Sequence, residues 1–68
     1  MITLSINGNA RSFDVVDFTV AQLVQQMGLE GRRIAIEKNG EIVPRGAHST
    51  TLLLSDDRLE IVGAVGGG

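Results

Sequence analysis

The first residues of the chain alternate between apolar and polar side chains. Residues 2–6, Ile-Thr-Leu-Ser-Ile, have the period of two that is typical of a strand with one buried face. The pair Asn7-Gly8 follows, and it favours a tight hairpin turn because both residues adopt positive φ angles at low cost. Residues 11–15 alternate again and place Phe13 and Val15 on one face. The pattern predicts an N-terminal hairpin of two strands.

One segment has the period of an amphipathic helix. Apolar side chains recur there at spacings of three and four residues, at Val20, Leu23, Val24 and Met27. Thr19 can cap the first turn, and Gln22 three residues later completes a capping box. Gly28 stands where a left-handed residue ends a helix, and Leu29 can fold back on the last turn. We expect one helix of about two and a half turns between Thr19 and Gly28.

The second half of the chain predicts three more strands. Residues 34–36 alternate, and the pair Asn39-Gly40 predicts a tight turn into a short strand, residues 41–43, which Pro44 ends. A last strand is expected around residues 59–61.

Residues 45–55 are read as an irregular connection with a helical turn near residues 49–53. The order of elements is β-β-α-β-β-β, which predicts an α+β fold with a mixed sheet and one main helix across one face. This order resembles the ubiquitin-like β-grasp fold. We expect a globular domain of residues 1–63 and a flexible tail of residues 64–68.

The tail is the most distinctive feature of the sequence. It ends in Val65-Gly66-Gly67-Gly68 directly after the last apolar strand. A glycine backbone without side chains can extend through a narrow channel, and from Gly63 it reaches on the order of 20 Å at 3.3–3.6 Å per residue. Glycine-rich ends are also commonly frayed and inert. The tail therefore indicates either a group delivered into another protein or an end without function.

Composition excludes several classes of site. The chain has 68 residues and no cysteine, so it has no disulfide, thiolate metal site or thiol nucleophile, and we expect a cytoplasmic protein. His48 has no second histidine to share a metal, and Asp56-Asp57 is interpreted as a solvated turn. The net charge is −2 and the basic residues are scattered, with Arg32-Arg33 as their only adjacent pair, so nucleic acid is not expected as a partner. The longest aliphatic run, Leu52-Leu53-Leu54, is too short to span a membrane.

Three stretches of the chain resemble the ThiS family, the sulfur carriers of thiamin biosynthesis. They are Thr19-Val20-Ala21-Gln22-Leu23, Asn39-Gly40-Glu41-Ile42-Val43-Pro44-Arg45, and Asp57-Arg58-Leu59-Glu60-Ile61-Val62 leading to Val65-Gly66-Gly67-Gly68. The resemblance spans the whole chain. It implies a carrier that is not itself an enzyme and that binds no metal or cofactor of its own.

The resemblance also implies a cycle of chemistry at Gly68. An E1-like adenylyltransferase uses ATP and magnesium to adenylate the Gly68 carboxylate, and a sulfur source such as a cysteine desulfurase system converts the adenylate to a thiocarboxylate. Thiazole synthase then receives the sulfur, with Val65, Gly66 and Gly67 entering the partner active sites. Activation is chemically necessary because a carboxylate is ionised at neutral pH and is a poor electrophile.

A docking surface is expected on the face of the sheet away from the helix. If Leu59 and Ile61 point inward, then Arg58, Glu60 and Val62 point outward, and Ala35 joins them. Three other functions remain open at this stage. They are a sulfur carrier of molybdopterin synthesis or another pathway, a ubiquitin-like modifier joined to lysine, and an interaction domain with an inert tail.

Overall fold

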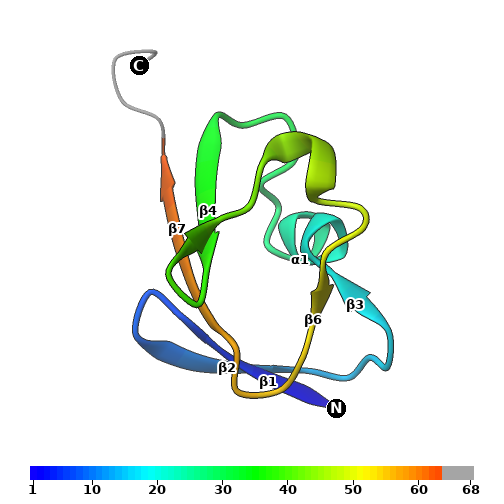
Figure 1. Cartoon of the computed structure of the whole chain (residues 1–68). Helices are drawn as coiled ribbons and strands as arrows, with labels where there is room; N and C mark the ends of the chain where they lie inside the picture. Colours follow the sequence, from blue (N-terminus) through cyan, green and yellow to red (C-terminus); the bar gives the residue numbers. More distant parts are fainter. Residues whose placement is uncertain (64–68) are drawn as a thin grey trace.

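A computed structural model describes residues 1–63 of the chain, and Figure 1 shows their arrangement. The main sheet has five strands: β1 (Ile2–Ile6), β2 (Asn9–Phe13), β4 (Ile34–Lys38), β5 (Glu41–Ile42) and β7 (Arg58–Gly63). Their order across the sheet is β2-β1-β7-β4-β5. The central pair β1–β7 is parallel, and the other three pairs are antiparallel. The predicted mixed sheet is confirmed.

Both predicted Asn-Gly turns are confirmed. Asn7 and Gly8 have φ angles of 51° and 85°, and Asn39 and Gly40 have 52° and 87°. Two residues with positive φ make the turn type whose twist matches that of paired strands.

The predicted bounds of the second strand were wrong. A two-residue turn puts residue 9 directly opposite Ile6, so β2 begins at Asn9 and ends at Phe13, opposite Ile2. Val15 lies beyond the strand, where its N–H donates to the carbonyl of Phe13 at 3.0 Å.

The predicted helix is α1 (Val20–Gln26), and both of its ends follow the sequence signals. Thr19 and Gln22 form the capping box: the N–H of Gln22 donates to Thr19 Oγ1 at 3.2 Å, and the N–H of Thr19 donates to Gln22 Oε1 at 2.9 Å. At the other end Gly28 has φ +69°. The N–H of Leu29 reaches the carbonyl of Val24 at 2.9 Å, which closes the Schellman motif.

The prediction for residues 45–55 was wrong in two respects. The helical turn lies earlier, as a 3-10 helix η1 (Arg45–Ala47), and β6 (Leu52–Leu53) pairs antiparallel with β3 (Phe18–Thr19). This pairing depends on tertiary contacts, because Leu53 is buried in the core, where it is paired with Phe18. Because β6 has only two residues, it shows no alternation from which a strand could be predicted.

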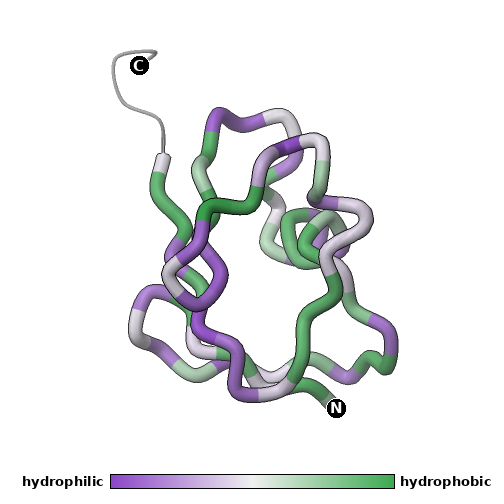
Figure 2. The backbone as a smooth tube through the Cα atoms, viewed as in Figure 1, coloured by the Kyte–Doolittle hydropathy of each residue, from purple (hydrophilic) through white to green (hydrophobic). Residues whose placement is uncertain are grey.

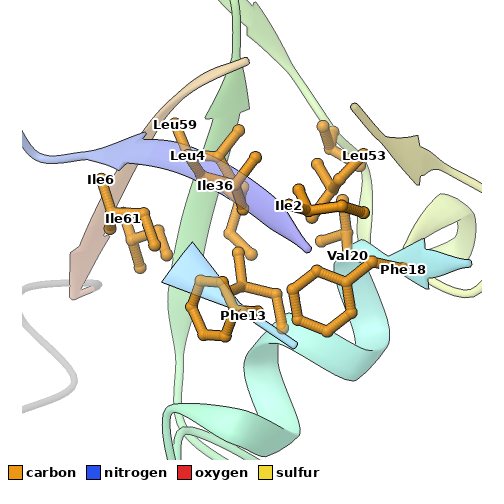
Figure 3. Close-up of a cluster of buried hydrophobic side chains, with 12 residues drawn as sticks. Ile2, Leu4, Ile6, Phe13, Phe18, Val20, Ile36, Leu53, Leu59 and Ile61 are labelled. Carbon is orange, nitrogen blue, oxygen red and sulfur yellow. The ribbon is translucent and has the colours of Figure 1, made fainter. Parts of the chain in front are cut away.

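The core lies between the main sheet and α1. Figure 3 shows apolar side chains from both layers meeting there. Figure 2 shows, in green, the hydrophobic positions along the chain. The twelve buried residues are Ile2, Leu4, Ile6, Phe13, Phe18, Val20, Leu23, Ile36, Val43, Leu53, Leu59 and Ile61. In the described part of the chain, no helix is long and apolar enough to cross a membrane.

Candidate functional site

The outer face of the sheet carries all four residues predicted for docking. Leu59 and Ile61 are buried against the core, and their neighbours Arg58, Glu60 and Val62 are exposed. Val62 is 58% exposed. Ala35 is exposed on β4 and lies directly opposite Val62 in the antiparallel β4–β7 pair. The structure therefore places these four residues on one surface, along β7 and the neighbouring part of β4.

Two further residues extend this face across β4 and β5, and the sequence reasoning missed them. Glu37 lies directly opposite Glu60, and Ile42 lies opposite Glu37 on the next strand. Ile42 is 62% exposed. The signal that could have found them is the Asn39-Gly40 turn, since a two-residue hairpin fixes which residues face each other. We use the name outer face for Ala35, Glu37, Ile42, Arg58, Glu60 and Val62.

The outer face combines exposed aliphatic side chains with two carboxylates side by side. Like charges directly opposite each other on neighbouring strands repel. The pair Glu37 and Glu60 therefore costs stability in the isolated chain. A partner that supplies a positive charge there would remove that cost.

The position of β7 is fixed by the side chain of Asn7. The backbone of β1 continues the parallel ladder as far as Asn7, whose N–H donates to the carbonyl of Leu59 at 2.9 Å. Beyond this point the chain turns away from β7, and the side-chain amide of Asn7 makes the next two hydrogen bonds to β7 in place of the backbone. Asn7 Nδ2 donates to the carbonyl of Ile61 at 3.0 Å, and the N–H of Ile61 donates to Asn7 Oδ1 at 2.7 Å. One amide thus satisfies both backbone groups of a residue two positions before Gly63.

The second Asn-Gly turn holds the start of β7 in a similar way. The N–H of Arg58 donates to Asn39 Oδ1 at 2.9 Å, and the N–H of Asn39 donates to the carbonyl of Arg58 at 2.7 Å. Asn39 Nδ2 also donates to Asp57 Oδ1 at 3.0 Å. The two turn asparagines therefore fix β7 at both ends. The sequence gives no sign of these contacts, because Asn7 and Ile61 are 54 positions apart.

The remaining candidates from the sequence have structural roles. Asp57 Oδ2 accepts from the N–H of Leu54 at 2.8 Å, so this carboxylate closes its own turn. His48 Nε2 lies 3.3 Å from the carbonyl of Val43. Within residues 1–63, no group of three or more histidine or carboxylate residues is arranged to hold a metal.

The tail predicted to carry the chemistry lies outside the described residues. This applies to Gly68, which was predicted to be modified, and to Val65, Gly66 and Gly67, which were predicted to enter partner active sites. What the structure does show is the point from which the tail continues. Gly63 ends β7 directly opposite Ile34, the first residue of β4.

Comparison with models of protein families identifies a match to this chain. The model of the ThiS family matches residues 4–68, which include the glycine tail.

The chain is also similar to solved structures of that family. A crystal structure of a thiamine biosynthesis protein (ThiS) from Geobacter metallireducens superposes with a TM-score of 0.85 at 26% identity, over 98% of this chain and 100% of the other. A solution structure of a thiamine biosynthesis protein from the same organism gives a TM-score of 0.81 at 26% identity, over 98% of this chain and 88% of the other. The likeness confirms the predicted β-grasp fold class.

Two curated relatives are named thiazole synthase. The one from Paramagnetospirillum magneticum is 40% identical over 65 residues, which are 96% of this chain and 20% of that protein. The one from Magnetococcus marinus is 34% identical over 50 residues, which are 74% of this chain and 15% of that protein. The chain therefore spans a fifth or less of the length of these relatives.

Proposed function

The chain belongs to the ThiS family, and from that premise we propose that it carries sulfur for the thiazole ring of thiamin. One observation carries the proposal: the family match begins in the first strand and continues through the glycine tail to Gly68. The match thus includes both the globular domain and the segment whose composition suits delivery of a reactive end into another protein.

We propose Gly68 as the covalently modified residue. Its carboxylate attacks the α-phosphate of ATP, magnesium-bound in an E1-like partner, and pyrophosphate leaves. A sulfide-level nucleophile, which a thiol reductant releases from a sulfur source such as a cysteine desulfurase system, then displaces AMP, and the product is a thiocarboxylate. The carrier supplies the carboxylate and a docking surface, and its partners supply the catalytic groups.

Thiazole synthase is the partner that the comparisons support best. In the relatives of that name, a segment similar to this chain forms part of a much longer polypeptide. Joining two modules in one chain raises their effective concentration for each other, which benefits modules that act together. We propose that the present chain meets a thiazole synthase in the same way, with residues 64–68 reaching its active site.

We propose the outer face as the surface that the activating partner covers. It lies on the strand that leads into the tail, and it presents Val62 and Ile42 to solvent. Exposed aliphatic side chains rimmed by charges are typical of protein interaction sites. Docking there would hold the body of the carrier while the tail extends.

Intact mass spectrometry tests the proposed function. The chain is incubated with an E1-like adenylyltransferase, ATP, magnesium and a sulfur source. A mass increase equal to replacing one oxygen by sulfur, dependent on ATP, supports the carrier. A lysine conjugate would instead indicate a modifier, and an unchanged mass would indicate an inert tail. The chemistry also requires Gly68 to be the last residue of the chain as the cell makes it, and the intact mass of the protein purified from its native cells tests this.

A further inference from the structure

A second surface lies on the opposite side of the fold from the outer face. It is a groove of about 330 Å³ between α1, the loop that leads into β4, and the segment around η1. Its apolar residues include Val24, Leu29 and Ile34, which are half-buried and pack against the core. Its polar residues are Gln22, Gln25, Glu30, Arg32, Arg45 and His48.

The groove carries more basic than acidic residues, although the chain as a whole is acidic. Arg32 and Arg45 are two of only six basic residues, and Arg33, next to Arg32 in sequence, is exposed. The eight acidic residues all lie within residues 1–63, and among them only Glu30 lines the groove. Its carboxylate accepts a hydrogen bond from Gln25 Nε2 at 3.2 Å, which holds it toward α1.

The two arginines are held together through the backbone. Arg45 Nη2 donates to the carbonyl of Arg32 at 3.4 Å, so this hydrogen bond joins the η1 segment to the loop before β4 without using a carboxylate. Guanidinium groups bind carboxylates in a planar, two-pronged geometry. An apolar floor beside two such groups suits a peptide segment with an apolar side chain next to acidic ones.

The groove lies at the same end of the molecule as the root of the tail. Ile34, which lines it, is directly opposite Gly63, the last described residue of β7. Figure 1 shows the loop before β4 and the end of β7 together at this end, and Figure 2 shows hydrophilic positions in that loop. A protein that receives the tail and also contacts the domain near Gly63 would therefore lie beside the groove.

We propose that the groove docks an acidic segment of thiazole synthase, with carboxylates on Arg32 and Arg45 and an apolar side chain over Leu29 and Ile34. This inference rests on the proposed function, since it assumes that the tail is delivered to that enzyme. It assigns the two partners to different surfaces: the activating enzyme to the outer face and thiazole synthase to the groove.

The test compares three variants in binding to purified thiazole synthase by surface plasmon resonance at physiological salt. The double variant Arg32→Glu/Arg45→Glu is expected to raise Kd by about tenfold or more, mainly through faster dissociation. Arg33→Glu is the matched control, because it reverses a neighbouring exposed charge that does not line the groove. It should change Kd by less than about threefold, as expected for a charge at the rim.

A third variant blocks the groove without endangering the fold. Ala21 lines the groove at the second position of α1, and the first turn of this helix has no acidic residue. Glutamate at that position favours a helix and complements its dipole. Ala21→Glu should therefore fold normally, as circular dichroism would show, and still weaken binding to thiazole synthase.

The mass assay on the same proteins separates this inference from the proposed function. All three variants should gain sulfur from the activating enzyme as the unmodified chain does. If the unmodified chain gains no sulfur, the proposed function fails. If it gains sulfur and the double variant and Ala21→Glu bind thiazole synthase with unchanged Kd, the groove inference alone fails. Two other results would also overturn the assignment to thiazole synthase. One is that the double variant and Ala21→Glu lose sulfur gain from the activating enzyme as strongly as they lose binding to thiazole synthase. The other is that the free chain self-associates and that Ala21→Glu abolishes this self-association.

Discussion

Replacing Asn7 by glycine should destabilise the fold through β7, although the side chain lies in an exposed turn. Glycine adopts the φ angle of 51° without strain, so the turn itself is preserved. What is lost is the pair of hydrogen bonds to the N–H and carbonyl of Ile61. The variant therefore isolates the role of the amide from that of the turn.

The magnitude follows from those two bonds. Each contributes a net ~0.5–1.5 kcal/mol, so the free energy of unfolding should fall by about 2 kcal/mol in total. For a domain of this size, 1 kcal/mol corresponds to about 4–8 °C in Tm, and the expected decrease is about 8–16 °C. Asn39→Gly is the control, because its amide bonds lie at an exposed site where water can replace them. It should cost about half as much.

Urea unfolding followed by far-ultraviolet circular dichroism measures the effect, since the chain has no tryptophan or tyrosine for fluorescence. Hydrogen exchange adds a local readout, in which the amide of Ile61 should lose protection in Asn7→Gly and keep it in Asn39→Gly. A cost below about 0.5 kcal/mol for Asn7→Gly, or a larger cost for Asn39→Gly, would refute the role given to the Asn7 amide.

Three further predictions concern single positions. Glu60→Gln should raise the free energy of unfolding by about 0.2–0.5 kcal/mol in urea titrations at low salt and by less at high salt, because it removes the repulsion from Glu37; an unchanged or lower stability would contradict this. Gly28→Ala should cost about 1–2 kcal/mol in the same assay because its φ is +69°, whereas Gly46→Ala, without a positive φ and with open space around it, should be close to neutral; equal costs would contradict the reasoning. Val62→Asp should weaken binding to the activating enzyme by about tenfold in a titration and leave the circular dichroism unchanged, and either loss of the fold or unchanged binding would show that the outer face is misassigned.

Local signals accounted for most of the fold. These signals are the capping box at Thr19, the left-handed Gly28 and the two Asn-Gly turns. Each involves only a few neighbouring residues, so it can be predicted from a short stretch of sequence. The alternation in the last strand placed Arg58, Glu60 and Val62 on an exposed face.

Several of the features missed from the sequence depend on contacts between distant segments. The strand Leu52–Leu53 exists because it pairs with Phe18–Thr19, and two residues are too few to show a period. The Asn7 amide binds Ile61 only because β1 and β7 are neighbours in the sheet. The groove likewise joins Arg32, in the loop before β4, to Arg45, at the start of η1, and neither segment alone indicates a binding surface.

The most direct test of sulfur transfer compares the chain with a variant that lacks Gly68. Both are incubated with the activating enzyme, ATP, magnesium and a sulfur source, and each intact mass is followed over time. Adenylation requires the terminal carboxylate within about 3–3.5 Å of the atom it attacks, and one missing residue withdraws it by about 3.3–3.6 Å. The variant should keep its circular dichroism spectrum and gain no sulfur, while the full chain gains one sulfur in place of oxygen. Sulfur gain by the Gly68 deletion at the rate of the full chain would contradict the carrier function.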